Sequence, residues 1–224
     1  MISVAIDGPA GAGKSTLSRK LAESLGFIYV DTGALYRAVG LKLMRNNCDC
    51  SDEKAVDSIL KTTKINICYE NGIQVVLLDG ENVNELIRTP EASMMASKCS
   101  AVSAVRAFLL DMQRNLAKEH SVVMDGRDIG TVVLPDAKVK IFLTATVAAR
   151  AKRRYDELIL KGENVTLEDV AADVEKRDYN DTHRNIAPLK PAENSIIVDT
   201  TELNFDESLE ALKQTVKSVL EGDK

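Results

Sequence analysis

The sequence predicts an α/β fold with a doubly wound, five-stranded parallel sheet, interrupted by an antiparallel β insertion and completed by a helical lid. Short apolar segments alternate with amphipathic helical segments along most of the chain, as they do where crossover helices join parallel strands. A glycine-rich loop directly follows the first apolar segment. After the second strand–helix pair, a two-residue hydrophobic period and tight-turn sequences replace this pattern, which indicates a small antiparallel sheet.

The chain opens with two strand–helix pairs. Residues 2–6 form an apolar run that predicts a buried strand, and residues 14–25 carry leucine and alanine at helical spacing before a stop at Gly26. Residues 27–30 are expected to form the second strand, and residues 34–43 the second helix. These pairs predict the first two strands of the parallel sheet.

The insertion follows. Residues 65–69 alternate apolar with polar side chains, and residues 73–77 continue the alternation after Asn71-Gly72, a pair that supplies the positive φ angles of a hairpin turn. A second turn signal, Asp-Gly, comes shortly afterwards. We therefore predict a small antiparallel meander at about residues 61–87.

The parallel pattern then resumes to the end of the chain. A capping residue, Thr166, with Asp169 three positions on predicts the start of a helix that ends near Asp181. The core is expected to comprise residues 1–60, 88–146 and 182–224, with the lid at about 147–181. The remaining elements are expected to be a helix at 102–118, strands at 122–124 and 139–143, an arginine-rich helix from about 147, a strand at 195–198 and a helix at 203–220.

The composition favours a soluble globular protein. Of 224 residues, 45% are hydrophobic and 28% are charged, and the formal net charge is −5. The acidic balance argues against a broadly basic nucleic-acid-binding surface, and the absence of tryptophan argues against a platform for stacked bases. Neither a secretory signal nor an apolar run of the roughly 20 residues that span a bilayer is visible. We expect a cytoplasmic protein that binds small molecules, and neither nucleic acid nor membrane.

Residues 8–15 match the P-loop pattern G-x-x-x-x-G-K-[ST] in full. Glycines allow successive backbone N–H groups to point at a phosphate, and the following helix directs its positive end to the same place. Lys14 is expected to reach the β- and γ-phosphates of a nucleoside triphosphate, and Ser15 to ligate Mg²⁺. The residues expected to bind the nucleotide are Gly8, Pro9, Ala10, Gly11, Ala12, Gly13, Lys14, Ser15 and Thr16.

Two more motifs follow predicted strands. The carboxyl ends of parallel strands form the ligand crevice of an open sheet, so residues 31–37 and Asp125 to Asp128 are expected beside the P-loop. Arg37 could hold a second anion there. Asp125 stands where P-loop enzymes place a carboxylate that faces Mg²⁺. Arg127 and Asp128 would extend into the crevice as a donor and an acceptor.

A third cluster contains Arg177, Asp181 and Arg184, whose spacing of i, i+4 and i+7 places them on one face of a helix. This face fits a surface ladder of ion pairs. It fits equally a site for phosphate and sugar hydroxyls, because arginine donates to phosphate in bidentate fashion and aspartate accepts from hydroxyls. The spacing alone does not separate these two interpretations.

A fourth cluster contains Arg150, Arg153 and Arg154, at spacings of i, i+3 and i+4. Like charges on one helical face repel each other unless an anion comes to them. We therefore predict that these arginines belong to a mobile lid that carries them to a bound triphosphate.

Together these motifs resemble those of the bacterial cytidylate kinases, a family of nucleoside monophosphate kinases. The predicted insertion fits as well, because members of this family resemble adenylate kinase but carry an enlarged monophosphate-binding insertion. Thr32 stands where some relatives have serine, and either hydroxyl can donate a hydrogen bond. The resemblance covers nearly the whole chain, and its segments are residues 8–15, 31–37 and 125–131, with Arg177, Asp181 and Arg184 followed by Ala187-Pro188-Leu189.

The resemblance implies transfer of the γ-phosphate of ATP to CMP, and to dCMP as well, by a monomer that uses Mg²⁺ with its ATP. It places Ser97 and Arg106 near the base with Asp128. The residues implied to surround CMP are Thr32, Arg37, Ser97, Arg106, Arg127, Asp128, Arg177, Asp181 and Arg184. Those implied in catalysis are Lys14, Arg127, Arg150 and Arg154, and those for the metal are Ser15 and Asp125.

Within this implied site, Asp181 and Arg177 would meet the sugar. Arg37, Arg127 and Arg184 are the candidates near the acceptor phosphate. Because a phosphate monoester is already largely dianionic near neutral pH, the reaction needs no general base, and the motifs contain no histidine or lone carboxylate placed as one.

Two other functions compete with this one. A P-loop kinase for a hydroxylated metabolite would need a positioned general base, and a panel of acceptors would separate it from a monophosphate kinase. A regulatory GTPase would need an Asn-Lys-x-Asp motif to read guanine, and the sequence contains none. A binding assay for nucleotide preference would distinguish that class.

Overall fold

The computed structural model describes residues 1–222 and confirms the five-stranded parallel sheet. The strand order is β2-β6-β1-β7-β8, and each neighbouring pair is parallel. The P-loop follows the central strand and therefore lies in the middle of the ligand-binding edge of the sheet. The strands are β1 (Ser3–Asp7), β2 (Ile28–Asp31), β6 (Val122–Gly126), β7 (Val139–Thr144) and β8 (Ile196–Asp199).

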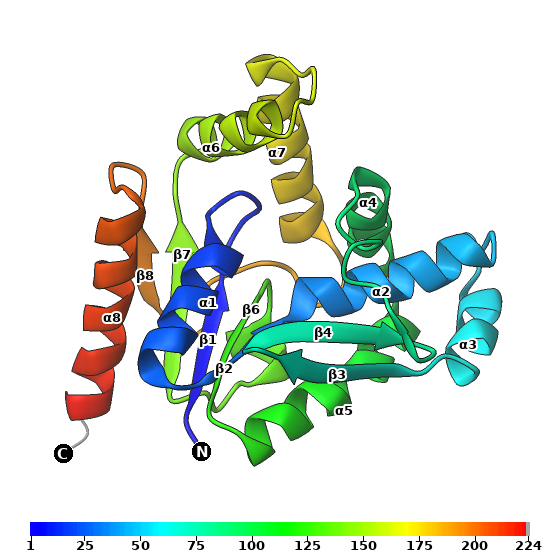
Figure 1. Ribbon diagram of the computed structural model, residues 1–224, viewed down its shortest axis with the longest axis horizontal. Coiled ribbons are helices and arrows are strands. Elements are labelled where there is room, and N and C mark those ends of the chain that lie inside the picture. Colours follow the sequence, from blue (N-terminus) through cyan, green and yellow to red (C-terminus); the bar gives the residue numbers. More distant parts are fainter. Residues whose placement is uncertain (223–224) are drawn as a thin grey trace.

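Helices cover both faces of this sheet (Figure 1). α1 (Lys14–Leu25) and α8 (Phe205–Gly222) pack on one face. α5 (Ser103–Glu119) covers the other face, together with a short π-helical turn, η1 (Ile129–Val133). Alternate side chains of β1 enter the two clusters, as the two-residue period of a strand requires. The sheet is therefore doubly wound, as predicted.

A separate antiparallel sheet interrupts this pattern, again as predicted. Its strands, in spatial order, are β3 (Ile65–Glu70), β4 (Ile73–Leu78) and β5 (Glu81–Asn82). Asn71 and Gly72 have φ angles of 52° and 76°, the conformation that a two-residue hairpin turn requires. Apolar residues of β3 and β4 pack against helices in a hydrophobic core of their own. Figure 1 shows this sheet beside the larger one.

Two helices that flank the small sheet are missing from the sequence-based prediction: α3 (Glu53–Lys61) and α4 (Pro90–Cys99). Both begin at capping residues that could have revealed them. At the start of α3, the Asp52 carboxylate accepts a hydrogen bond from the N–H of Ala55. At the start of α4, the Thr89 hydroxyl accepts the N–H of Ala92, and Pro90 occupies the next position. α2 (Thr32–Arg45) also begins earlier than predicted, because a side-chain cap extends it to the strand end.

The segment predicted as the lid is a helical hairpin of α6 (Val147–Leu160) and α7 (Leu167–His183). It lies above the loop between β1 and α1 in Figure 1 and has a small hydrophobic cluster of its own. The hydroxyl of Thr166 accepts the N–H of Asp169 at 3.1 Å, which confirms the predicted helix start. The boundaries of the hairpin as a moving unit stay a prediction.

The prediction that Arg177, Asp181 and Arg184 share one helical face is wrong for Arg184. α7 ends at His183, and Arg184 has the extended backbone angles φ −65° and ψ 141°. The chain then folds back, because the N–H of Leu189 donates to the carbonyl of Asp181 at 2.8 Å. Arg184 is thereby directed away from the helix axis and toward the end of β6.

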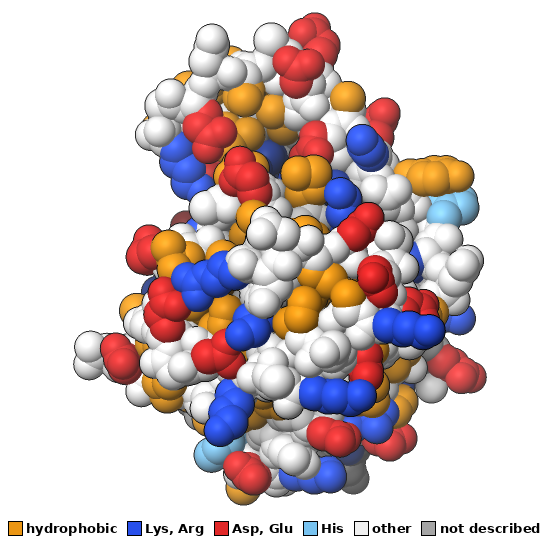
Figure 2. Space-filling view, turned by 90° about the vertical axis from the view of Figure 1, so that its right-hand side faces the viewer, with side chains coloured by type: hydrophobic (Ala, Val, Ile, Leu, Met, Phe, Trp, Pro, Cys, Tyr) orange, Lys and Arg blue, Asp and Glu red, His pale blue; other side chains and the backbone are white. Residues whose placement is uncertain are grey.

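No helix within residues 1–222 is long and apolar enough to cross a membrane. Figure 2 shows the face on the right-hand side of Figure 1, where Lys and Arg side chains are interspersed with Asp and Glu.

Candidate active site

The carboxyl ends of the central strands open into a cleft of about 740 Å³. Ten Lys and Arg side chains and six Asp and Glu side chains are among the described residues that line it, so the cleft is cationic although the chain carries a net charge of −5. A concave site with excess positive charge favours an anionic ligand. The predicted site residues in its lining are Ala10, Gly11, Ala12, Gly13, Lys14, Ser15, Thr16, Thr32, Arg37, Ser97, Asp125, Arg127, Asp128, Arg154, Arg177, Asp181 and Arg184.

The P-loop makes a sharp turn between β1 and α1. Gly13 has a φ of 81°, which glycine adopts without the penalty that a Cβ imposes. A Cβ on Gly8 would collide with the carbonyl oxygen of Leu143 on β7, so only glycine allows the loop to pass so close to that strand. Gly8 and Pro9 therefore support the loop from behind, and neither is among the residues that line the cleft.

Lys14 is buried at the base of the loop. Its Nζ donates to the carbonyl oxygen of Pro9 at 2.7 Å. Burial, with the nearby Arg127 guanidinium as the next contribution, lowers the pKa of the Lys14 ammonium group. A phosphate held in the loop would supply the negative charge that favours the protonated lysine.

Asp125, at the end of β6, lies among hydroxyl groups. Its two carboxylate oxygens accept hydrogen bonds from Ser15 at 3.0 Å and from the Tyr29 hydroxyl at 2.8 Å. Burial, and after it the neighbouring carboxylate of Asp31, raises the pKa of Asp125. A buried carboxylate beside a serine hydroxyl is an oxygen donor set that suits Mg²⁺, and a cation would offset the charge of two adjacent carboxylates. These residues therefore fit the predicted metal.

The inserted sheet is joined to the edge of β2 through side chains. Gln74 of β4 accepts the N–H of Asp31 at 2.9 Å and donates to its carbonyl at 3.3 Å. The Tyr69 hydroxyl donates to the carbonyl of Tyr29 at 3.0 Å. The Asp31 carboxylate in turn pairs with Arg37 at 3.0 Å. The insertion thus holds the strand end from which the predicted acceptor residues project. These contacts could not be predicted from the sequence, because the residues that form them are about 40 positions apart in the chain.

A buried cluster of two arginines and one aspartate forms the far wall of the site. Arg106 and Arg184 donate to different oxygens of Asp128, Arg184 at 3.1 Å. The guanidinium of Arg106 also lies over the ring of Tyr36, 5.9 Å from its centroid. Arg106 itself is behind the wall and not among the cleft-lining residues. The cluster carries one excess positive charge in a buried position.

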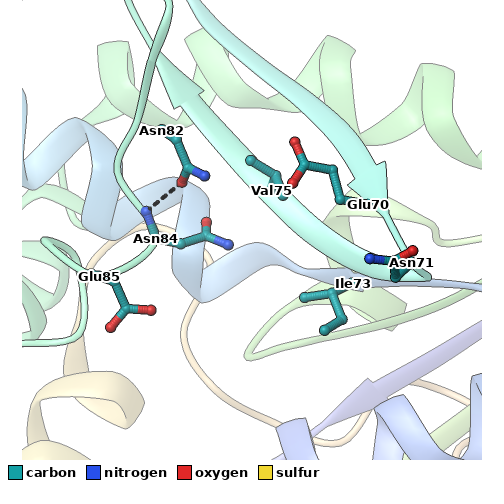
Figure 3. Close-up of a pocket in the computed structure, with 7 residues that line it drawn as sticks. All are labelled: Glu70, Asn71, Ile73, Val75, Asn82, Asn84 and Glu85. Atoms are coloured by element: carbon teal, nitrogen blue, oxygen red, sulfur yellow. Dashed lines mark hydrogen bonds between the residues drawn. The ribbon is translucent and has the colours of Figure 1, made fainter.

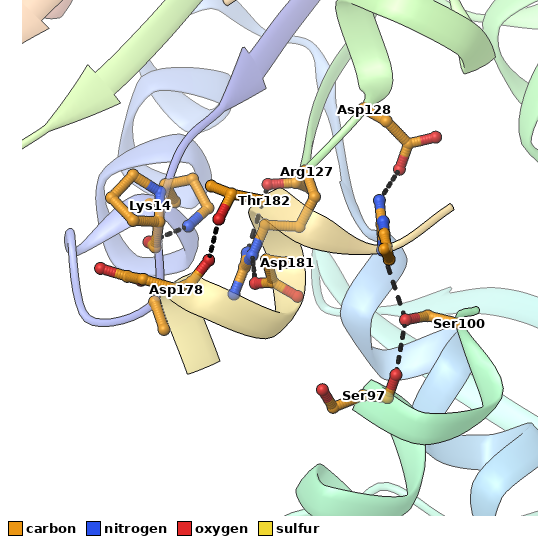
Figure 4. Close-up of polar contacts among 12 residues, drawn as sticks. Lys14, Ser97, Ser100, Arg127, Asp128, Asp178, Asp181 and Thr182 are labelled. Atoms are coloured by element: carbon orange, nitrogen blue, oxygen red, sulfur yellow. Dashed lines mark hydrogen bonds and ion pairs between the residues drawn. The ribbon is translucent and has the colours of Figure 1, made fainter. Parts of the chain in front are cut away.

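Asp181 and Arg177 have different partners in this structure. Asp181 accepts from Nε of Arg127 at 2.6 Å, and Arg177 pairs with Asp173 one helical turn earlier at 2.9 Å. Figure 4 shows Asp181 directed at Arg127, with Lys14 on the neighbouring loop. The Arg127–Asp181 pair joins the end of β6 to the last turns of α7.

The three lid arginines do not form an unpaired cationic face, and part of the negative charge that their spacing was expected to require comes from the protein's own carboxylates. Arg150 is 4% exposed and donates to Asp178 at 2.6 Å and to the carbonyl of Ala10 at 2.9 Å. Arg153 donates to backbone carbonyls in the segment between β8 and α8. Arg154 forms an ion pair with Glu157 at 2.8 Å. Each guanidinium has an oxygen partner within the protein, and the carboxylates that pair with Arg150 and Arg154 reduce the repulsion. Arg150 lies outside the residues that line the cleft.

Asp7, at the end of β1, supports the loop that carries Arg127 and Asp128. Its carboxylate accepts the N–H groups of Ile129 at 2.7 Å and Gly130 at 2.8 Å. Burial raises the pKa of Asp7 to about 6. Sequence analysis did not single out this residue, although an aspartate that ends a buried strand is a signal that a partner must exist.

The raised pKa of Asp7 predicts a pH dependence of stability. The folded state binds a proton at Asp7 more readily than the unfolded state, so this group makes the protein more stable as the pH falls from about 6 toward 4, by up to about 1.4 kcal/mol per pH unit. We therefore expect wild-type protein to gain stability relative to Asp7→Asn as the pH falls over this interval. Urea denaturation at several pH values measures the difference between the two free energies of unfolding. Parallel curves for the two proteins would contradict the assignment.

A second hollow, of about 430 Å³, lies on the inserted sheet (Figure 3). Its lining includes Glu70, Glu85 and three asparagines, and neither Lys nor Arg is among the described residues that form it. It lacks the cationic donors that bind phosphate. We therefore expect phosphate groups to bind in the larger cleft, which the P-loop residues line.

Several residues of the cleft were not predicted from the sequence. Arg19 lies one turn along α1 from the predicted Ser15 and Thr16, so helical spacing could have suggested it. Ser100 follows the predicted Ser97 by three residues and carries the same signal, whereas Arg88 carries none, because only the path of the chain around the insertion brings it to the cleft.

Comparisons with known proteins point to one family. A cytidylate kinase family profile matches residues 4–218. The chain is 51% identical over 222 residues to a cytidylate kinase of Caldicellulosiruptor bescii, covering 99% of this chain and 98% of that one. It is 48% identical to a cytidylate kinase of Lactobacillus johnsonii, covering 97% and 94%. The solved structure of an uncharacterized protein from Eubacterium ventriosum shares the fold, with a TM-score of 0.54, 13% identity and coverage of 97% and 99%. The chain belongs to the cytidylate kinase family and is a kinase.

Proposed function

We propose that this enzyme transfers the γ-phosphate of ATP to CMP, and also to dCMP, giving ADP and the corresponding nucleoside diphosphate. The observation that carries the proposal is that one cationic cleft contains residues 10–15 of the P-loop together with a second set of arginines at Arg37, Arg127 and Arg184. Two anion-binding groups in one cleft suit a donor triphosphate and an acceptor monophosphate. The names of the relatives support a cytidine monophosphate, with cytosine as its base, as the acceptor.

The far wall supports a cytosine site. Cytosine presents an amino donor next to acceptor atoms. Asp128 can accept from such an amino group, and Ser97 and the arginines that hold Asp128 can donate to the acceptors. We assign base recognition to Asp128, Ser97 and Arg106, and contacts with the sugar to Asp181 and Arg177.

Catalysis in this proposal depends on alignment and charge. The acceptor monoester is largely dianionic near neutral pH and needs no general base. Lys14, Arg127 and Arg154 would stabilise the charge that spreads over the transferred group. Mg²⁺, held by Ser15 and Asp125, would neutralise developing charge on the phosphoryl oxygens. Arg150, whose donors are engaged with Asp178 and the P-loop backbone, would fix the lid to the loop.

Closure of the lid at about residues 147–181 would exclude water, which otherwise hydrolyses ATP. We further propose that the insertion, at about 61–87, holds the monophosphate, and that the enzyme acts as a cytoplasmic monomer on small molecules and not on nucleic acid or membranes.

The proposal is tested by measuring ADP formation from ATP with CMP, dCMP, UMP, AMP and GMP offered in turn, each with Mg²⁺ and with excess EDTA. We expect turnover with CMP and dCMP that EDTA abolishes. Preference for another monophosphate would overturn the base assignment and keep the kinase chemistry. Acceptor-independent release of phosphate would favour a nucleotide-hydrolysing switch instead.

A further inference from the structure

Ser100 lies where the insertion-side helix α4 meets the buried arginine cluster. It is the C-cap of α4, is 8% exposed and belongs to the lining of the cleft. Its hydroxyl donates to the carbonyl of Ser97 at 2.9 Å and accepts from Nη1 of Arg184 at 3.3 Å. Its own carbonyl accepts from Nη1 of Arg106 at 3.3 Å. One residue thus contacts Ser97 and both arginines that hold Asp128.

The charge of the cluster explains why these contacts matter. Arg106 and Arg184 share the single carboxylate of Asp128, so one positive charge is left without a counterion in a buried place. Oxygens with partial negative charge must stabilise it. Ser100 supplies one such oxygen to each arginine, and it does so from the C-terminal end of α4, the negative end of the helix dipole.

The same contacts fix the position of α4. Ser97 projects from the last turn of that helix, and its carbonyl is held by the Ser100 hydroxyl. Arg184 is fixed from the other side, because its Nε donates to the carbonyl of Ala187 at 2.7 Å. Figure 4 shows Ser97, Ser100 and Asp128 along one line of polar contacts. A shift of α4 would therefore move Ser97 relative to Asp128.

We propose that Ser100 is a positioning residue for base recognition, which sets the distance between Ser97 on α4 and the Arg106–Asp128–Arg184 cluster. This inference rests on the proposed function, because Ser97 and Asp128 are the groups assigned there to the cytosine ring. The hydroxyl acts through its two partners, the carbonyl of Ser97 and the guanidinium of Arg184. Its loss should weaken acceptor binding and leave phosphoryl transfer intact.

The test compares Ser100→Ala, Ser100→Thr and the control Ser103→Ala, which changes an exposed serine at the start of α5. Steady-state kinetics give kcat and the KM of each substrate. For Ser100→Ala we expect the KM for CMP to rise about 5- to 10-fold, the effect of one lost hydrogen bond of ordinary strength. The KM for ATP and kcat should stay within about twofold. Ser100→Thr, which retains a hydroxyl, should restore the KM for CMP to within about twofold of wild type.

A KM for CMP that is unchanged in Ser100→Ala would overturn the inference, as would equal rises in the KM values for CMP and ATP. Failure of Ser100→Thr to restore binding, with circular dichroism showing a folded protein, would also overturn it. Wild-type protein in the same assay tests the proposed function by itself. No CMP-dependent turnover by wild type refutes that function, whereas normal wild-type turnover with a normal Ser100→Ala variant refutes only the role of Ser100.

Discussion

Replacement of Lys14 by alanine is expected to lower kcat at least ~100-fold, the scale of a lost charged group that stabilises a transition state. Lys14 is the buried cation of the P-loop, and burial already lowers its pKa, so the apo protein gains little from its charge. The carboxylates of Asp125, Asp181 and Asp7 favour that charge without offsetting the cost of burial, and a bound phosphate would add a strong opposite charge. Steady-state ADP formation with saturating CMP and ATP measures the effect.

The matched control for this variant is Lys20→Ala, on the same helix. Lys20 is exposed and pairs with Glu23 at the surface, so kcat should stay within about twofold. The thermal stability of Lys14→Ala should not fall, because removing a buried lysine also removes its desolvation cost. Near-normal turnover of a folded Lys14→Ala protein would refute the role assigned to this residue.

The substitution Asp128→Asn is expected to destabilise the protein by about 3–5 kcal/mol, the cost of leaving buried charges without their partner. Two buried guanidinium groups depend on this carboxylate, and the amide that replaces it offers one oxygen acceptor and places N–H donors against one arginine. The free energy of unfolding, from urea denaturation at neutral pH, measures the loss.

Two further variants separate this cause from general damage. Asp111→Asn, on the exposed face of α5, should change the free energy of unfolding by no more than about 0.5 kcal/mol. In the double variant Asp128→Asn/Arg184→Met, removal of one arginine should make the total loss smaller than the sum of the two single losses by about 1 kcal/mol or more. Additive losses would mean that Asp128 does not serve to compensate the arginines.

Local signals were sufficient to predict most elements of the fold. The P-loop lies between an apolar strand and an amphipathic helix, and the Asn71-Gly72 turn adopts the predicted positive φ angles. The helices α3 and α4 escaped prediction although their capping residues, Asp52 and Thr89, were visible. The pairing of Arg150 with Asp178 could not be read from the sequence, because spacing shows which residues share a face but not what packs against that face.

The sequence by itself determined the strand–helix pattern, the P-loop with Lys14 and Ser15, and the family of the enzyme, since each depends on residues close together in the chain. Only the tertiary structure decided which charges are paired. Asp128 meets Arg106 and Arg184 across separations of 22 and 56 residues, and Asp181 meets Arg127 across 54. Such pairs form because the fold brings α5 and the end of α7 to the loop that follows β6, where burial makes an unpaired charge too costly to persist.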